Sequence, residues 1–328
     1  MYDKKMAMFY ILDILREYSD KDHLLKQKDI INKLHDIYLI DIERKTVSST
    51  IELLIEYGYD IIKNNSGGGY YLNEREFDEN EIKYLIDAIY SSKSISGSQA
   101  KRISKKLYSK LSKFEQKDYS YLYKSTEINR STNKDIFLNI ELINEAIKER
   151  KKISFIYLSY DKKGKLSERR DGKRYYVSPY FLVNNFNKYY LICGSDYKDH
   201  HYNYRIEYMK DIVITKYDIR DYRDIETLGE NFDITKHIND HIYMFGGDVI
   251  TAKIELLNDD AITFVVDWFG NNAKIYEDNN KIFANIKSND NAFFFWALQY
   301  QEHIKVLSPE KMVTKIVNTL EDSIKKYR

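Results

Sequence analysis

The chain has 328 residues, of which 43% are hydrophobic and 31% are charged, and its net charge is +1 at pH 7. This composition excludes a disordered chain, and the length favours two or three globular domains. No run approaches the roughly 18 apolar residues of a membrane span. The lone Cys193 excludes an internal disulfide and fits a reducing compartment. We therefore expect a cytoplasmic protein with no membrane partner.

Basic residues are clustered along the chain although the net charge is close to zero. Residues 93–113 contain seven Lys and Arg and no acid, and residues 151–174 contain nine Lys and Arg against three acids. Local basic patches favour contacts with phosphates more than total charge does. The alternative for each patch is an ordinary solvated face.

Residues 1–73 are predicted to form three short helices and a β-hairpin. Apolar residues recur at helical spacing in three runs: Met8, Ile11, Leu12 and Leu15; Ile30, Ile31, Leu34 and Ile37; Val47, Ile51, Leu54 and Ile55. Two apolar stretches then flank the glycine turn at 67–69. This order is typical of a winged helix-turn-helix, whose third helix enters the major groove of duplex DNA.

The candidate DNA-binding residues lie at the start of the third predicted helix and in the hairpin. Cations suit phosphates and guanine edges, and hydroxyls suit bases or backbone. The set is Arg44, Lys45, Thr46, Ser48, Ser49 and Lys63. Because residues 1–70 hold ten Lys and Arg against twelve Asp and Glu, contact with protein instead of DNA remains the alternative. The stretch containing Lys45-Thr46-Val47, Ile51, Leu54 and Gly58 resembles the recognition helix of DeoR-like winged-helix regulators.

Residues 74–138 are predicted to be a helical linker. Ile82, Leu85, Ile86 and Ile89 form one apolar stripe, and Ile103, Leu107 and Leu111 form a second within the basic run. The polar stretch 91–98 separates them, and residues 115–138 carry no assignable pattern. An amphipathic linker helix and the pairing of half-sites in operators favour a homodimer.

Residues 139–222 are predicted to form one helix and about five short strands. The pattern indicates a strand turning at Lys163-Gly164, a hairpin turning at Asn184-Asn185, and one further strand over 200–220. Such a set is typical of a small, strongly bent barrel of the Sm or SH3 type.

This region resembles the WYL-domain family. The resemblance lies in Ile153-x-Phe155-x-Tyr157, Val177-x-Pro179-Tyr180, Tyr189-Tyr190-Leu191 and Tyr204-Arg205-Ile206-Glu207. Tyr189 stands in place of the family's tryptophan, and Tyr202 and Tyr208 stand where the family has arginines. The resemblance implies a barrel that binds a ligand, in several members a nucleic acid or nucleotide, and relays the signal to a winged helix.

The candidate ligand-binding residues combine guanidinium groups with aromatic rings. Arginine offers a planar fork to phosphates or base edges, and tyrosine offers a stacking surface. The set is Arg205, Tyr157, Tyr189, Tyr204, Tyr208, Arg169, Arg170 and Arg174, with Arg205 the leading contact. Alternating tyrosines in strands are also common as core or cross-strand pairs.

Residues 223–247 are predicted to be a linker, and residues 248–328 a C-terminal domain. The order strand, helix, hairpin, helix, strand and final helix indicates a ferredoxin-like α/β sandwich. The Leu307-Ser308-Pro309-Glu310 stretch is similar to the extension (WCX type) that follows many WYL domains. The fold class is thus a multidomain α+β protein.

No catalytic, cofactor or metal site is predicted. His237-x-x-x-His241 has the spacing of a metal-binding pair, but the sequence places no third ligand beside it. Phosphate-loop and nucleophile-elbow motifs are absent from the sequence. We therefore expect a ligand-responsive transcription regulator bound to operator DNA. The alternatives are an accessory nucleic-acid-sensing module and, third, a nucleic-acid-processing enzyme.

Overall fold

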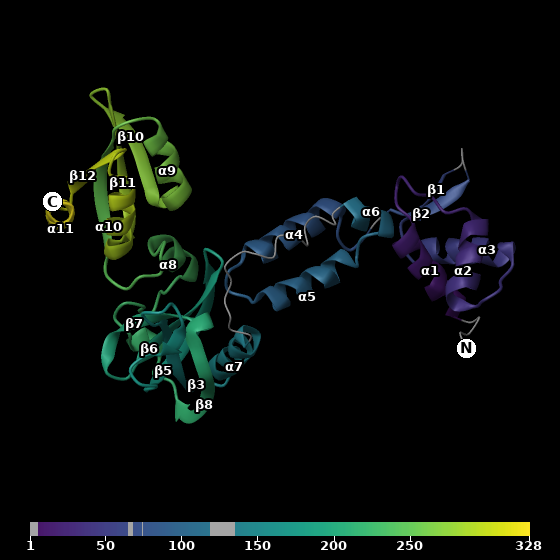
Figure 1. Ribbon diagram of the computed structural model, residues 1–328, viewed down its shortest axis with the longest axis horizontal. Helices are drawn as coiled ribbons and strands as arrows, with labels where there is room; N and C mark the ends of the chain where they lie inside the picture. The colour runs from purple at the N-terminus through teal and green to yellow at the C-terminus, as the bar shows by residue number, and fades with distance from the viewer. Residues whose placement is uncertain (1–5, 65–67, 74, 119–134) are drawn as a thin grey trace. The chain divides into compact units, whose positions relative to one another are not determined.

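The chain divides into two compact units, Met1–Lys134 (unit 1) and Asp135–Arg328 (unit 2), shown in Figure 1. The structure is a computed structural model that describes residues 6–64, 68–73, 75–118 and 135–328. It is a mixed α+β protein with a helical N-terminal region that carries a small hairpin, a central antiparallel sheet and a C-terminal α/β sheet.

Unit 1 begins with three helices and a two-stranded hairpin. The elements are α1 (Ala7–Tyr18), α2 (Gln27–Tyr38), α3 (Arg44–Glu56), β1 (Ile61–Asn64) and β2 (Gly69–Leu72). The predicted apolar stripes form one core, in which Ile11, Leu34 and Ile51 are at most 1% exposed. Leu25 adds an antiparallel bridge to Tyr70 beside the hairpin. The predicted three helices and hairpin are confirmed.

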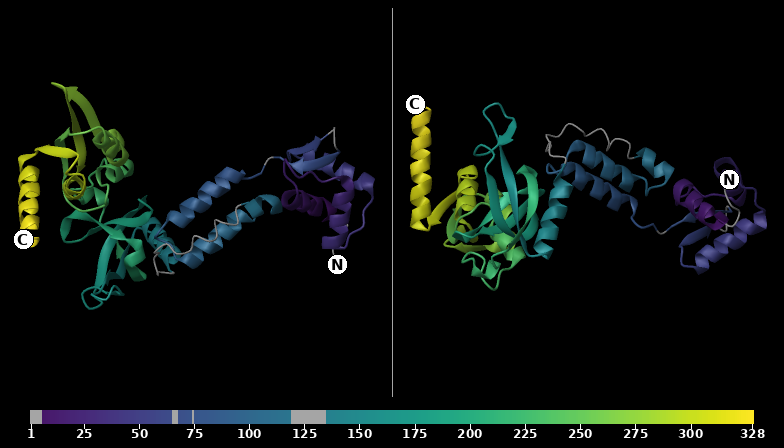
Figure 2. Two further views of the ribbon diagram at one scale, coloured as in Figure 1. Left: turned by 45° about the horizontal axis from the view of Figure 1, so that its top comes forward. Right: turned by 90° about the horizontal axis from the view of Figure 1, so that it is seen from below.

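The rest of unit 1 is helical. It comprises α4 (Glu79–Ser91), α5 (Gly97–Tyr108) and α6 (Lys113–Asp118), and Figure 2 shows α4 and α5 side by side. Asp78 caps α4 and Ser96 caps α5, each through a capping box. The break predicted over 91–98 is therefore present. Most of the stretch that carries no assignable pattern, residues 119–134, lies outside the described residues.

The first part of unit 2 is α7 (Ile136–Lys148) followed by six antiparallel strands. The strands are β3 (Lys151–Tyr160), β4 (Leu166–Glu168), β5 (Arg174–Asn185), β6 (Lys188–Ser195), β7 (Lys198–Arg205) and β8 (Met209–Asp218). They are ordered β4-β3-β5-β6-β7, and β8 also pairs with β3. Asn139 of α7 donates to the Met209 carbonyl at 2.9 Å, which fastens the helix to β8.

Two sequence predictions for this sheet were wrong. The hairpin turns at Phe186-Asn187, whose φ angles are 46° and 58°, and not at Asn184-Asn185, which still pair with β6. The expected single strand over 200–220 is two strands, β7 and β8, separated by a 3-10 turn at Ile206–Tyr208. Ile206 is fully buried there, and the backbone turns to put both Ile206 and Glu207 inside.

The segment between the two sheets contains a short helix, α8 (Ile234–Asp240). Ile225, Leu228 and Met244 of this segment pack into a core with residues of β5 and β6. Asp240 contacts the C-terminal part of unit 2, where its carboxylate accepts from Asn272 at 2.8 Å and lies 3.3 Å from the Lys287 ammonium. The predicted linker is therefore packed between the central and C-terminal sheets.

The C-terminal part of unit 2 has the chain order βαββαβα. Its elements are β9 (Val249–Leu256), α9 (Asp260–Phe269), β10 (Ala273–Asp278), β11 (Lys281–Asn289), α10 (Asp290–Gln299), β12 (Ile304–Ser308) and α11 (Glu310–Lys326). The antiparallel sheet is ordered β10-β11-β9-β12. Phe293 and Trp296 are fully buried in its core.

None of the helices in the described ranges combines the length and the apolarity that crossing a bilayer requires.

Candidate DNA-binding and ligand-binding sites

The first turns of α3 present a polar surface above an apolar core. Val47, Ile51 and Leu54 are at most 2% exposed, because their helical spacing places them on one face. Glu43 precedes the first turn, and its side chain makes no capping hydrogen bond. Four of the predicted DNA contacts are exposed on the other face: Arg44, Lys45, Thr46 and Ser49.

Gln27, at the start of α2, ties the two helices together. Its amide nitrogen donates to the Ser48 hydroxyl, and its amide oxygen accepts from the Arg44 guanidinium. Ser48 is half-buried and hydrogen-bonded within the protein, whereas Arg44 is exposed. Lys63 is exposed on β1, opposite Tyr70 of the hairpin.

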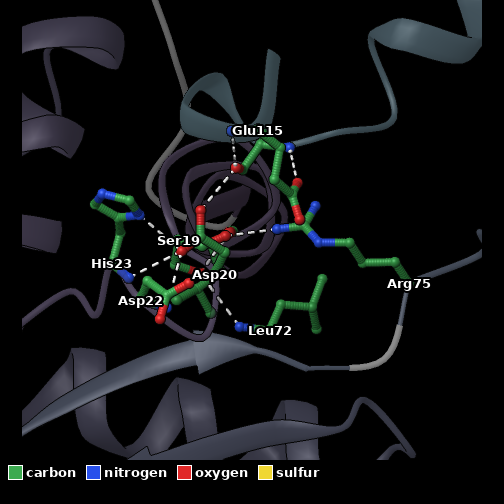
Figure 3. Close-up of polar contacts among 9 residues, drawn as sticks. Ser19, Asp20, Asp22, His23, Leu72, Arg75 and Glu115 are labelled. Atoms are coloured by element: carbon green, nitrogen blue, oxygen red, sulfur yellow. Dashed lines mark hydrogen bonds and ion pairs between the residues drawn. The ribbon is translucent and has the colours of Figure 1, made fainter. Parts of the chain in front are cut away.

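The turn after α1 is joined to the start of α6 by the buried carboxylate of Asp20 (Figure 3). One oxygen accepts from the Ser112 hydroxyl at 2.8 Å. The other accepts from the backbone N–H groups of Asp22 and His23 at 3.0 and 2.9 Å, and lies 2.8 Å from His23 Nδ1. The His23 ring stacks on Phe114 with 3.7 Å between centroids. We call this group the Asp20 junction.

The Asp20 carboxylate is held in its ionised form. Burial raises the pKa of this carboxyl, but the hydrogen bonds from His23, Ser112 and Asp22 outweigh burial and leave the pKa below its ordinary value. Arg75 adds a second set of contacts, donating to the carbonyls of Arg16 at 2.9 Å and Ser19 at 2.5 Å. The segment before α4 and the start of α6 are thus hydrogen-bonded to the end of α1 and the turn that follows it.

Unit 2 contains a cavity of about 790 Å³ that combines cations with aromatic rings. Two of the predicted arginines line it, together with cationic Lys198 and the His200 ring. Its aromatic lining comes from Tyr175, Tyr176, Tyr202 and Tyr204, and Met244, Gly246 and Gly247 also line it. The predicted residues that the structure brings together here are Arg169, Arg170 and Tyr204.

The tyrosines of the cavity contact further aromatic rings of the central sheet. The Tyr204 ring lies 5.8 Å from Tyr175 and 5.0 Å from Tyr157, and the Arg170 guanidinium lies 5.9 Å from the Tyr175 ring. Burial raises the pKa of Tyr157 to about 12 and raises the pKa of Tyr204 as well. Both phenols therefore stay protonated and remain hydrogen-bond donors at neutral pH.

Arg205 does not line this cavity. Its guanidinium donates to the carboxylate of Glu207, with 2.9 Å from Nε to Oε1, and lies 4.4 Å from the Tyr208 ring centroid. Glu207 is only 2% exposed, so the arginine balances a buried negative charge. The backbone N–H of Arg205 donates to the Tyr157 hydroxyl at 3.2 Å. Arg205 thus stabilises this turn through its own contacts, and it is also a candidate for contact with the ligand.

Two other predicted residues lie away from the cavity lining. Arg174 donates to the Ser154 carbonyl at 3.1 Å and to the Asp211 carbonyl at 2.6 Å, which ties β5 to β3 and β8. Tyr189 is half-buried on β6, opposite Asn184. Sequence reasoning missed Lys198, His200 and Tyr175 as cavity residues, although Lys198 and His200 belong to a polar run beside the tyrosines.

Residues 139–214 match the WYL domain family, so the chain contains a WYL domain. Among solved structures, proteasome accessory factor B/C (PafBC) of Arthrobacter aurescens is similar at 15% identity with a TM-score of 0.28, over 98% of this chain and 48% of that chain. This chain therefore spans about half the length of that protein. A CRISPR Cas-related protein is similar at 16% identity with a TM-score of 0.39, over 98% of this chain and 84% of that chain. No curated protein matches the sequence.

Proposed function

We propose that this WYL-domain protein is a ligand-responsive, DNA-binding transcription regulator and not an enzyme. The winged helix binds duplex operator DNA, and the WYL barrel binds a nucleic acid, a nucleotide or a similar anion. The observation that carries the proposal is the exposed row of Arg44, Lys45, Thr46 and Ser49 at the start of α3. Cations and hydroxyls at that end of a third helix suit contacts with the major groove.

We assign five segments to this function. They are the winged helix-turn-helix (1–73), the helical linker and dimerisation region (74–138), the WYL barrel of Sm or SH3 type (139–222), a linker (223–247) and a ferredoxin-like domain (248–328). The strand order β10-β11-β9-β12 supports the last assignment, because it places the first and third strands of the domain at the centre. The exposed cations Lys101, Arg102, Lys105 and Lys106 of α5 supply further phosphate contacts when two copies pair on DNA.

The lining of the cavity supports the assignment of a nucleotide-like effector. Arg169, Arg170 and Lys198 supply the positive charge that phosphates need, and Tyr175 and Tyr204 supply ring faces for a base. A cavity of about 790 Å³ falls within the size range of small-molecule sites. Arg205, Tyr157 and Tyr208 form a second group beside these tyrosines and stay candidates for effector contact.

DNA binding is tested with the full chain and a duplex from the region upstream of its own gene. We expect saturable binding whose affinity falls linearly with salt on logarithmic axes, because phosphate contacts release counterions. Arg44→Ala/Lys45→Ala should weaken binding at least about tenfold and reduce the salt slope. The matched control is Lys274→Ala/Lys311→Ala, which removes two exposed cations from the C-terminal domain. Equal loss in both variants would count against α3 as the binding element.

The alternative function is an accessory module whose winged helix contacts protein. The acidic balance of residues 1–70, ten Lys and Arg against twelve Asp and Glu, favours this alternative. It predicts that duplex binding is absent at low salt, while Arg44→Ala/Lys45→Ala weakens a protein complex. The same DNA titration therefore separates the two functions.

A further inference from the structure

Three histidines that are distant in the sequence meet between the WYL barrel and α8. His201 lies on β7, His237 lies within α8, and His241 follows the last residue of that helix. One ring nitrogen from each lies within 4.8 Å of the others. The sequence suggested His237 and His241 as a pair without a third ligand, and the structure supplies His201 as the third.

The three imidazoles are buried, with exposures of 8%, 5% and 4% for His201, His237 and His241. The ring centroids of His237 and His241 are 4.1 Å apart, and those of His201 and His237 are 4.8 Å apart. The Nε2 atoms of His201 and His237 have no hydrogen-bond partner among the described residues. Two buried and unsatisfied nitrogens in one cluster are costly for a folded protein unless something else binds them.

The Nδ1 atoms of His241 and His201 are already oriented by contacts with the protein. His241 Nδ1 lies 2.9 Å from the His237 carbonyl, which can only accept, so Nδ1 carries the proton and Nε2 keeps its lone pair. His201 Nδ1 lies 2.8 Å from the Thr227 hydroxyl. Metal-bound histidines commonly use their second nitrogen in this way, because the contact fixes the ring and its tautomer.

The surroundings keep the rings in the form that binds metals. Burial lowers the pKa of His201 to about 4 and also lowers the pKa of His237 and His241. All three rings are therefore neutral at physiological pH, and no proton has to leave before a metal binds. Asp240 is directed to Asn272 and Lys287 and so does not complete the cluster.

We propose that His201, His237 and His241 bind one divalent transition-metal ion, with Zn²⁺ as the best match. Imidazole nitrogens suit Zn²⁺, and three of them leave the fourth tetrahedral position for water or another small ligand. Bonds of about 2.0 Å place the nitrogens about 3.3 Å apart. The present separations are at most 4.8 Å, so a pair of nitrogens has to close by up to about 1.5 Å. Such a movement is within reach of side-chain rotation in three imidazoles.

The metal fastens the segment containing α8 to the barrel. His201 also lines the ligand cavity, and Met244, Gly246 and Gly247, a few residues beyond His241, line the same cavity. Gly246 is in turn bonded to the C-terminal domain, because its carbonyl accepts from Asn291 at 2.9 Å. An ion at the three histidines would therefore fix one wall of the cavity against the barrel.

The proposal is tested on the full chain after removal of any affinity tag. Titration with Co²⁺ should give the visible d–d absorption of four-coordinate cobalt, saturating at one ion per chain, and Zn²⁺ should abolish it. Zn²⁺ should also raise the melting temperature. A folded chain with no saturable cobalt band would overturn the proposal. Because this readout involves no DNA, it can fail while the regulator function holds.

Variants assign the ligands. His237→Gln should weaken Co²⁺ binding by more than about 100-fold, beyond the losses typical of outer-shell changes. The matched control is His35→Gln, which changes an exposed histidine of unit 1 and should leave the cobalt affinity unchanged. If His237→Gln binds Co²⁺ as tightly as the wild-type chain does, the three histidines are not the site. Circular dichroism of each variant establishes that it is folded before binding is measured.

Discussion

The protein joins neighbouring segments with two kinds of buried polar group. At the Asp20 junction of unit 1, an ionised carboxylate accepts from a hydroxyl and two backbone N–H groups and lies beside a histidine. In unit 2, the three buried imidazoles are neutral, and two have a ring nitrogen without a partner among the described residues. The first junction is satisfied by the chain itself. The second has the capacity to bind something that the chain does not supply.

Substitution of Arg205 is expected to lower the free energy of unfolding the most, because Arg205 balances a buried charge. Arg205→Ala leaves Glu207 buried without its cation, which costs roughly 3–5 kcal/mol. The measurement is urea unfolding followed by tryptophan fluorescence, since Trp268 and Trp296 both lie in unit 2. Arg205→Ala/Glu207→Gln should recover much of the loss. A wild-type midpoint for Arg205→Ala would show that the ion pair is unimportant and restore Arg205 as a purely ligand-binding residue.

Substitution of Asp20 is expected to cause the next largest loss of stability. Asp20→Ala removes the acceptor for three N–H or O–H groups and should destabilise unit 1 by about 2 kcal/mol. Hydrogen exchange across α1 and α6 measures the loss, with unit 2 as the internal reference. The control is Asp22→Ala, because Asp22 is exposed and contributes only its backbone N–H to the junction. Equal effects of the two substitutions would contradict the role of the carboxylate.

Acidification should weaken the contributions of the three histidines and of the Asp20 junction at different pH values. The pKa of His201 falls from 6.5 in the unfolded chain to about 4 in the folded protein, so the unfolded state binds the proton first. The free energy of unfolding of metal-free unit 2 should decrease as the pH falls below about 6.5, by up to about 1.4 kcal/mol per pH unit for each such histidine. Asp240 next to His241 opposes part of this loss for that ring.

The Asp20 junction should respond only at a lower pH. The pKa of Asp20 lies below its unfolded value of 3.8, so its contribution is complete above that value and is lost as the pH falls through the folded pKa. Between about pH 6.5 and pH 4, hydrogen exchange corrected for its intrinsic rate should therefore show unit 2 weakening before unit 1. The reverse order would contradict the contrast between the two junctions.

The smallest effect is expected for His237→Leu in metal-free protein. An apolar side chain of similar size replaces a buried nitrogen that has no partner, so the free energy of unfolding should change by less than about 1 kcal/mol. Added Zn²⁺ should stabilise the wild-type chain and not the variant. A large loss without metal would mean that the imidazole already has an essential contact within the protein.

Local patterns predicted much of the fold. The helix at 44–56 is visible in the spacing of Val47, Ile51 and Leu54, and the C-terminal order of strands and helices follows from alternating apolar residues. The prediction failed where backbone direction depends on burial, as at Ile206, whose turn splits one expected strand into two. Hairpin turns also shift by a residue or two when both flanking sequences can pair.

The candidate sites were less visible in the sequence than the fold. Tyrosines and arginines in strands predicted a ligand region, but which of them share a cavity depends on which way each side chain faces. Arg174 and Arg205 use their guanidinium groups within the protein, whereas Arg169 and Arg170 line the cavity. His201 joins His237 only because α8 packs on β7, a tertiary contact that no periodicity encodes.

We propose that an effector bound in the WYL cavity changes the affinity of α3 for DNA. The most direct test measures duplex affinity with and without a saturating 5′-phosphorylated single-stranded oligonucleotide or mononucleotide, in the wild-type chain and in Arg170→Ala. We expect the probe to bind the wild-type chain and to shift its duplex affinity about 5- to 150-fold. Arg170→Ala should lose this shift while still binding duplex. A probe that binds in the cavity and leaves the duplex affinity of the wild-type chain unchanged would contradict effector control of DNA binding.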